Sequence, residues 1–182
     1  LTGVIVAAGC GAMVALILSI APDHKLHGML FWLMGDLSQA TSPKLVLGVL
    51  VAVLIIAMPF ARELNLLARG PDTAQALGVQ VGSLRRGVYL VASLATAAAV
   101  TQAGSIGFIG LIVPHLVRLA VGNDQRLLLP ASALAGGSLL VVADTLARSL
   151  IAPQQLPVGV LTALIGVPVF LFLLARDSRL RR

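Results

Sequence analysis

Charge is scarce in this 182-residue chain: Asp, Glu, Lys and Arg together make up only 11% of it. A soluble domain carries about 25%. Hydrophobic residues make up 58%, and apolar runs of about 20 residues recur with almost no charge inside them. These runs predict transmembrane helices and exclude an ordinary soluble domain.

Aromatic residues are also few, at 4% of the chain. A net charge of +6 is compatible with nucleic-acid binding, but that function needs basic residues clustered with aromatic ones. In a membrane protein the same positive charge sets the orientation of the loops. We therefore expect a lipid bilayer around most of the chain and no nucleic-acid partner.

Disulfide and metal chemistry have little support in the sequence. Cys10 is the only cysteine and lies between two glycines, which excludes a disulfide within the chain and indicates a small packing residue. His24 and His27 lie one turn apart in a short polar loop, where solvated side chains are more common than a metal site. We expect no metal site.

The motifs of common membrane-associated enzymes are absent. There is no Walker A sequence for ATP, no HExxH and no GxSxG. A membrane-embedded hydrolase using His115 is one alternative function, although His115 lacks a partner in the sequence. An ion-coupled secondary transporter is another, but such proteins keep carboxylates near the midplane, and Asp144 is the only acid within the apolar runs. No catalytic residue and no cofactor are expected in this chain.

What the sequence does contain is a series of apolar segments. Spans are expected at about 1–21, 44–61, 87–103, 106–121, 127–147 and 157–175. A further apolar stretch at 26–35 is too short to cross, and Trp32 within it suits the headgroup level. The expected fold class is an all-α membrane protein: a bundle of about six transmembrane helices, one short re-entrant or interfacial helix, and short cytoplasmic helices.

Residues 62–86 form the one long polar interruption. Pro71 suits the first position of a short helix, Asp72 places an acid in its first turn, and Gly78 suits its end. Gly82 is expected to break the chain again. Apolar residues throughout the loop favour one or two short helices over a solvated linker, which is the alternative. Such a loop suits a docking surface for another protein.

Basic residues divide unevenly between the two sides of the expected bundle. Three of the thirteen, Lys25, Lys44 and Arg148, fall on one side. The ten on the side of residues 62–86 are Arg62, Arg69, Arg85, Arg86, Arg118, Arg126, Arg176, Arg179, Arg181 and Arg182. The positive-inside rule therefore predicts that the loop and the C-terminus are cytoplasmic.

Small and helix-weakening residues mark two spans. In the first span, small residues fall four apart and share one face, which either packs against a neighbour or lines a passage. These residues are Gly3, Ala7, Gly11 and Ala15. In the fourth span, a proline and two glycines indicate either a deformable segment or a static kink. These residues are Gly107, Gly110 and Pro114.

Asp144 and Arg148 are four residues apart at the outer end of the fifth span, so they share a helix face. Their pairing as ions would lower the cost of placing both near the membrane. The alternative is that Arg148 faces outward to meet an acidic partner.

Several stretches are distinctive beyond their composition. They are GSIGFIGLIVPHLVRL at 104–119, GNDQRLLLPASALAGGSLLVVADTLAR at 122–148 and LPVGVLTALIGVPVFLFLL at 156–174, with further stretches at 65–86 and 31–38. Together they resemble the FecCD family, the iron-siderophore and vitamin B12 permeases of ABC importers. The resemblance implies one permease domain over residues 1–182, corresponding to the last six helices of a ten-helix subunit that works as a homodimer.

The resemblance also implies roles for particular residues. Arg148 matches an outward-facing arginine that pairs with a glutamate of the substrate-binding protein. The first span would line the pore, and residues 26–35 would form a short helix at the outer gate. The helices that contact the ATPase subunits would include Pro71, Asp72, Ala74, Gln75, Leu77, Gly78, Val79, Val81 and Gly82.

The function implied is uptake of a metal chelate across the bacterial inner membrane by ATP-driven alternating access. ATP would be bound by the partner ATPase subunits and not by this chain. The cargo would be siderophore-bound iron, haem or cobalamin, and these motifs do not distinguish among the three.

Overall fold

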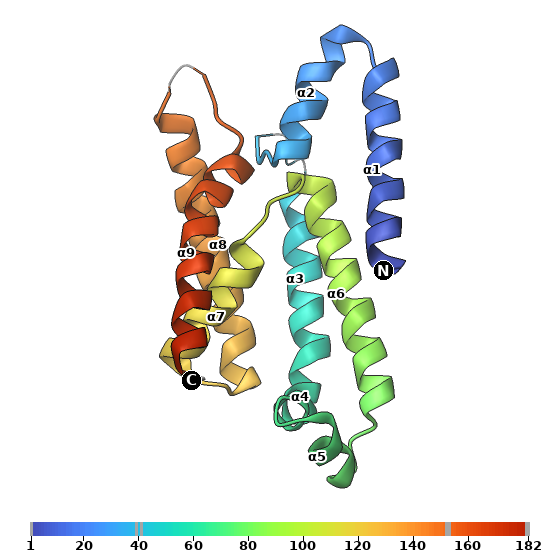
Figure 1. The fold of residues 1–182 in the computed structure, drawn as a ribbon, viewed down its shortest axis with the longest axis vertical. Coiled ribbons are helices and arrows are strands. Elements are labelled where there is room, and N and C mark those ends of the chain that lie inside the picture. Colours follow the sequence, from blue (N-terminus) through green and yellow to red (C-terminus); the bar gives the residue numbers. More distant parts are fainter. Residues whose placement is uncertain (1, 39, 41, 152–153, 181–182) are drawn as a thin grey trace.

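The computed structural model describes residues 2–38, 40, 42–151 and 154–180, and the elements assigned within these ranges are all helices (Figure 1). They are α1 (Thr2–Ile20), α2 (Asp23–Met34), α3 (Pro43–Ala57), the 3-10 turn η1 (Met58–Phe60), α4 (Ala61–Leu67), α5 (Pro71–Ala76), α6 (Val81–Ala103), α7 (Ile109–Val121), α8 (Gln125–Ser149) and α9 (Val158–Leu180).

The long helices form two groups (Figure 1). In one group α3 packs against α6, and in the other α7, α8 and α9 pack together. The short helices α4 and α5 lie at one end of the molecule, and α2 lies at the opposite end. The C-terminal end of α9 lies at the same end as α4 and α5. The polar loop and the C-terminal end of α9 thus share one end, as the charge pattern predicts.

Several helices are long and apolar enough to cross a membrane, which confirms the predicted fold class. Within the described residues, Thr2–Ile20, Pro43–Leu67 and Gln125–Ser149 have both the length and the hydropathy of a span. The other three expected spans correspond to α6, α7 and α9. Of these, α7 and residues 158–173 are shorter apolar helices.

Some element boundaries differ from the sequence-based expectation. The fourth span was expected from residue 106, but α7 begins at Ile109 because Phe108 has a positive φ of 67° and ends the preceding irregular segment. The expected break at Gly82 is wrong, since α6 begins at Val81 and continues through it. The short helix expected at 26–35 is α2, which begins directly after Pro22.

The segment between α3 and α6 has a small core of its own. We call residues 61–80, which contain α4 and α5, the elbow. The side chains of Ala74, Val79, Val81 and Leu84 are buried, and Leu64, Leu66 and Leu67 pack against them. Burying these apolar groups holds α4, α5 and the first turn of α6 together. The polar loop is therefore a folded unit and not a solvated linker.

Backbone segments cross closely where α2 ends, and we call this contact the glycine crossing. Gly159 in the first turn of α9 donates its N–H to the carbonyl of Gly35 at 3.3 Å. A Cβ on Gly159 would overlap the carbonyl of Met34, and one on Gly104 would overlap the carbonyl of Trp32. The end of α2 is thus joined to α9 and to the α6–α7 connection by contacts that only glycine permits.

The first helix stands apart from this framework. α1 has no buried residue, and Ile5, Leu16 and Ile20 are 71%, 63% and 76% exposed. Apolar surface of this extent is stable against lipid or against further protein, and not in water.

Candidate coupling and docking sites

The predicted helix in the polar loop is α5, and local chemistry sets both of its ends. Pro71 occupies the first turn, where its missing N–H costs nothing, and Asp72 follows it. At the other end Gly78 has a φ of 85° and donates its N–H to the carbonyl of Gln75 at 2.9 Å. Val79 N–H then donates to the carbonyl of Ala74 at 3.0 Å, which closes the helix.

The structure divides the predicted coupling residues into a buried set and an exposed set. Ala74, Val79 and Val81 face the core of the elbow, so their side chains hold its shape. The exposed residues are Pro71, Asp72, Gln75, Leu77, Gly78 and Gly82. Leu77 is the most conspicuous of these, because a leucine side chain that is 60% exposed lies at the tip of α5. Direct contact with another protein is open only to the exposed set.

An open groove of about 810 Å³ lies beside this exposed tip. Residues from α3, η1, α4 and α6 line it together with those that follow α5, among them Phe60, Glu63, Leu77, Gln80 and Leu84. Its walls are mostly apolar with polar groups at intervals. Such a concave surface beside an exposed leucine suits a protein side chain or a short helix.

A hydrogen-bonded contact that the sequence did not reveal ties the elbow to α8. The Asn65 side chain, on α4, donates through Nδ2 to Oδ1 of Asp124 at 2.9 Å. Its Oδ1 accepts the backbone N–H of Gln125, also at 2.9 Å. Both functional atoms of the amide are therefore used, and we call this contact the Asn65 bridge.

Asp124 is also the N-cap of α8, because its Oδ1 accepts the backbone N–H of Arg126 at 3.1 Å. The hydrogen bond from the Asn65 amide, followed by that from Arg126, lowers the pKa of the Asp124 carboxyl below its usual value. An aspartate just before an apolar helix is a recognisable cap signal. Asn65 has no such local signal, since its partner is 59 residues away.

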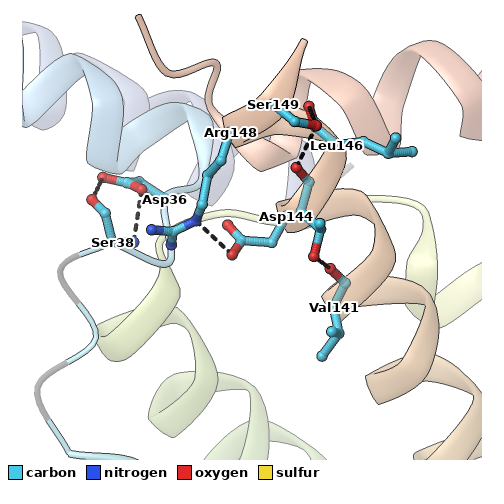
Figure 2. A network of polar contacts seen from close by, with 8 residues as sticks. Asp36, Ser38, Val141, Asp144, Leu146, Arg148 and Ser149 are labelled. Carbon is cyan, nitrogen blue, oxygen red and sulfur yellow. Dashed lines mark hydrogen bonds and ion pairs between the residues drawn. The ribbon is translucent and has the colours of Figure 1, made fainter. Parts of the chain in front are cut away.

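At the opposite end of the molecule, Arg148 lies in the last turn of α8. Its Nε donates to Oδ2 of Asp144 at 2.8 Å, which confirms the ion pair expected from their spacing. Figure 2 shows the guanidinium lying between Asp144 and Asp36. The Asp36 carboxylate accepts the backbone N–H of Ser38 at 2.9 Å.

The pair with Asp144 leaves much of Arg148 accessible. A guanidinium has five N–H donors, and the bond to Asp144 uses Nε. The Arg148 side chain is 41% exposed, against 23% for Asp144. An exposed pair of this kind contributes about 0.3–0.5 kcal/mol. The pair therefore orients the Arg148 side chain and leaves part of its guanidinium exposed.

In the part of the chain that the structure describes, the predicted passage residues do not come together at one place. Gly3, Ala7, Gly11 and Ala15 lie on α1, whose residues are all unburied. Gly107 precedes α7, while Gly110 and Pro114 lie within it. An added Cβ on Gly107 or Gly110 would meet nothing within 4 Å. Whether these residues serve packing or passage stays a prediction.

The three histidines form no site in the described residues. His115 is exposed on α7. The ring of His27 lies 4.5 Å from that of Phe31 on the same helix, as centroids. No group of three potential metal ligands occurs in the part of the chain that the structure describes.

Known proteins share this arrangement of helices. A solved structure described as an inward-facing conformation of a putative metal-chelate type ABC transporter matches with a TM-score of 0.86 at 35% identity, over 96% of this chain and 57% of that one. The bundle thus has the fold of an ABC-transporter permease. The model of the FecCD transport family matches residues 1–176, so the chain belongs to this family and the sequence-based resemblance is confirmed.

Two relatives illustrate the range of the family. The hemin transport system permease protein HmuU of Yersinia pestis is 43% identical, over 100% of this chain and 55% of its own length. The cobalamin import system permease protein BtuC of Halobacterium salinarum is 46% identical, over 100% of this chain and 48% of its own. The chain therefore spans about half the length of these relatives.

Proposed function

We propose that the chain forms the C-terminal part of the membrane-spanning permease subunit of an ABC importer. The cargo class is a metal chelate such as haem, cobalamin or siderophore-bound iron, for which the names of the relatives are the support. The location is the bacterial inner membrane, with the elbow and the C-terminus in the cytoplasm. The observation that carries the proposal is the elbow, a folded unit with an exposed apolar tip at the arginine-rich end.

The mechanism assigns different tasks to the two ends. In the cytoplasm an ATP-binding cassette subunit docks on the exposed residues of α5 and moves the elbow when it closes on ATP. The buried residues of the elbow keep its shape, so the movement passes to the helices. ATP is bound and hydrolysed by that partner, and this chain supplies no ATPase residue and binds no cofactor.

Outside the cell, the substrate-binding protein docks partly through Arg148. The exposed part of the guanidinium suits a carboxylate of that protein, as an addition to the bond with Asp144. The released chelate would pass between two copies of the permease, with α1 and its small residues as one wall. The glycines and the proline of α7 would let that helix adjust as the passage opens.

The test is uptake into proteoliposomes that contain the complete permease, its ATPase and its binding protein. Haemin, cobalamin and a ferric siderophore are supplied in turn, and uptake of one of them with ATP inside is expected. A matched control uses an ATPase whose Walker A lysine is replaced, which should abolish that uptake. Uptake that persists with this ATPase and stops with an uncoupler would identify an ion-driven transporter instead.

A further inference from the structure

The two groups of helices are connected at both ends of the molecule. At one end the turn after α2 contacts both groups, because Asp36 N–H donates to the carbonyl of Ala103, the last residue of α6, and Gly35 accepts the N–H of Gly159 on α9 at the glycine crossing. At the elbow end α4, which continues from α3, packs against α8. The Asn65 bridge spans this second contact, since Asn65 belongs to α4 and Asp124 and Gln125 begin α8. The elbow therefore has a direct attachment to the group that contains α7, α8 and α9.

The surroundings of the bridge make it a close and oriented contact. Ala61, one turn before Asn65 on α4, is fully buried. Leu128, one turn after Asp124 on α8, is 4% exposed. Residues four apart lie on one face of a helix, so each helix presents a buried apolar residue and a hydrogen-bonding residue at this contact. α4 packs against α8, and the two hydrogen bonds of the amide orient this contact.

The choice of asparagine is chemically specific at this position. Its amide donates to a carboxylate and at the same time accepts a backbone N–H. An aspartate at 65 could accept the N–H of Gln125 but would place a second carboxylate beside that of Asp124. A leucine could do neither. The asparagine amide satisfies both partners while Asp124 keeps its charge.

We propose that Asn65 is a positioning residue that transmits movement of the elbow to α8. This inference rests on the proposed function, in which a partner ATPase moves the elbow. Through the bridge, displacement of α4 pulls on the first turn of α8. α8 runs from Gln125 to Ser149 with Pro130 inside it, and we expect the displacement to reach the turn that carries Arg148. Docking of the ATPase, by contrast, does not require Asn65.

The chain offers a compensating exchange that separates bond geometry from other effects. Asn65→Asp alone places two carboxylates in contact and should break the bridge. Adding Asp124→Asn restores both bonds, because the new amide donates to the carboxylate at 65 while its oxygen still caps the N–H of Arg126. Asn123→Asp is the matched control, since it makes the same change at an exposed neighbour of Asp124.

The experiment is hydrogen–deuterium exchange of the assembled transporter, with and without ATP plus vanadate to trap the closed ATPase. Two regions are compared: residues 71–80 of the elbow, and the far end of α8, residues 143–151. In the unaltered protein and in Asn123→Asp, trapping should change exchange in both regions. In Asn65→Asp the change in the elbow should remain, while the change in α8 falls by about fivefold or more. The double variant should recover it.

The outcomes distinguish this inference from the proposed function. No change in the elbow of the unaltered protein would remove the proposed function itself. A change in the elbow with none in α8, or an unaltered α8 response in Asn65→Asp, would overturn the role of Asn65 alone. So would loss of the elbow response in Asn65→Asp, because Asn65 would then serve docking. If Asn65→Asp does not assemble, the test uses the double variant Asn65→Asp with Asp124→Asn. Failure of this variant to assemble, or to show the exchange change in α8, also overturns the inference.

Discussion

Replacing Leu77 by alanine tests whether the tip of the elbow is the surface that the ATPase subunit contacts. Leu77 is 60% exposed, so a docking partner could still bury most of its side chain. Its side chain is absent from the core formed by Ala74, Val79, Val81 and Leu84. The elbow should therefore keep its fold when Leu77 is shortened, and the effect should fall on binding.

The size of the effect follows from the area that a partner can still cover. Burying a whole leucine side chain is worth about 1.5–3 kcal/mol. With 60% of Leu77 exposed, covering the remainder is worth about 1–2 kcal/mol. This corresponds to an increase of about 5- to 30-fold in the Kd for the ATPase subunit.

The assay is binding of the purified ATPase subunit to the permease in lipid nanodiscs. Leu134→Ala is the matched control, because Leu134 is 74% exposed on α8, within a candidate membrane span. The same truncation there should leave the Kd unchanged. If Leu77→Ala and Leu134→Ala both bind the ATPase as the unaltered protein does, the tip of α5 is not the contact surface.

Three further substitutions test the core of the elbow, the docking role of Arg148 and the glycine crossing. Ala74→Leu places a large side chain in the filled core of the elbow, which should cost about 1–3 kcal/mol and lower the midpoint of thermal unfolding. Gln75→Leu, on the exposed side, should leave that midpoint unchanged. Equal midpoints for the two variants would show that Ala74 does not lie in a filled core. Arg148→Gln should weaken capture of the binding protein with little change in the unfolding midpoint, since the exposed pair that it removes is worth only about 0.5 kcal/mol; normal capture would remove the docking role. Gly159→Ala should destabilise the permease because its Cβ overlaps a carbonyl, whereas Gly137→Ala, in open space on α8, should not; equal thermal stability of the two variants would contradict the crossing.

Local chemistry in the sequence predicted the elements that depend on neighbouring residues. The helix α5 was predictable because Pro71, Asp72 and Gly78 act within one or two turns of their own positions. The pair of Asp144 and Arg148 was predictable for the same reason, since helical spacing alone brings them together.

Contacts between distant segments were not predictable in this way. Asn65 and Asp124 meet across 59 residues, and neither the periodicity nor the composition around Asn65 points to a partner. The same holds for the close approach of Gly104 to Trp32 and of Gly159 to Met34. A glycine in an apolar run signals a close approach in general, but the packed fold determines which segment approaches.

The joining of the two helix groups at both ends has a geometric consequence. Two bodies that share two fixed points keep a single rigid-body freedom, which is rotation about the line through those points. Here the points are the glycine crossing and the Asn65 bridge, at opposite ends of the molecule. While both hold, α7, α8 and α9 can turn as one body against α3 and α6 only about that line.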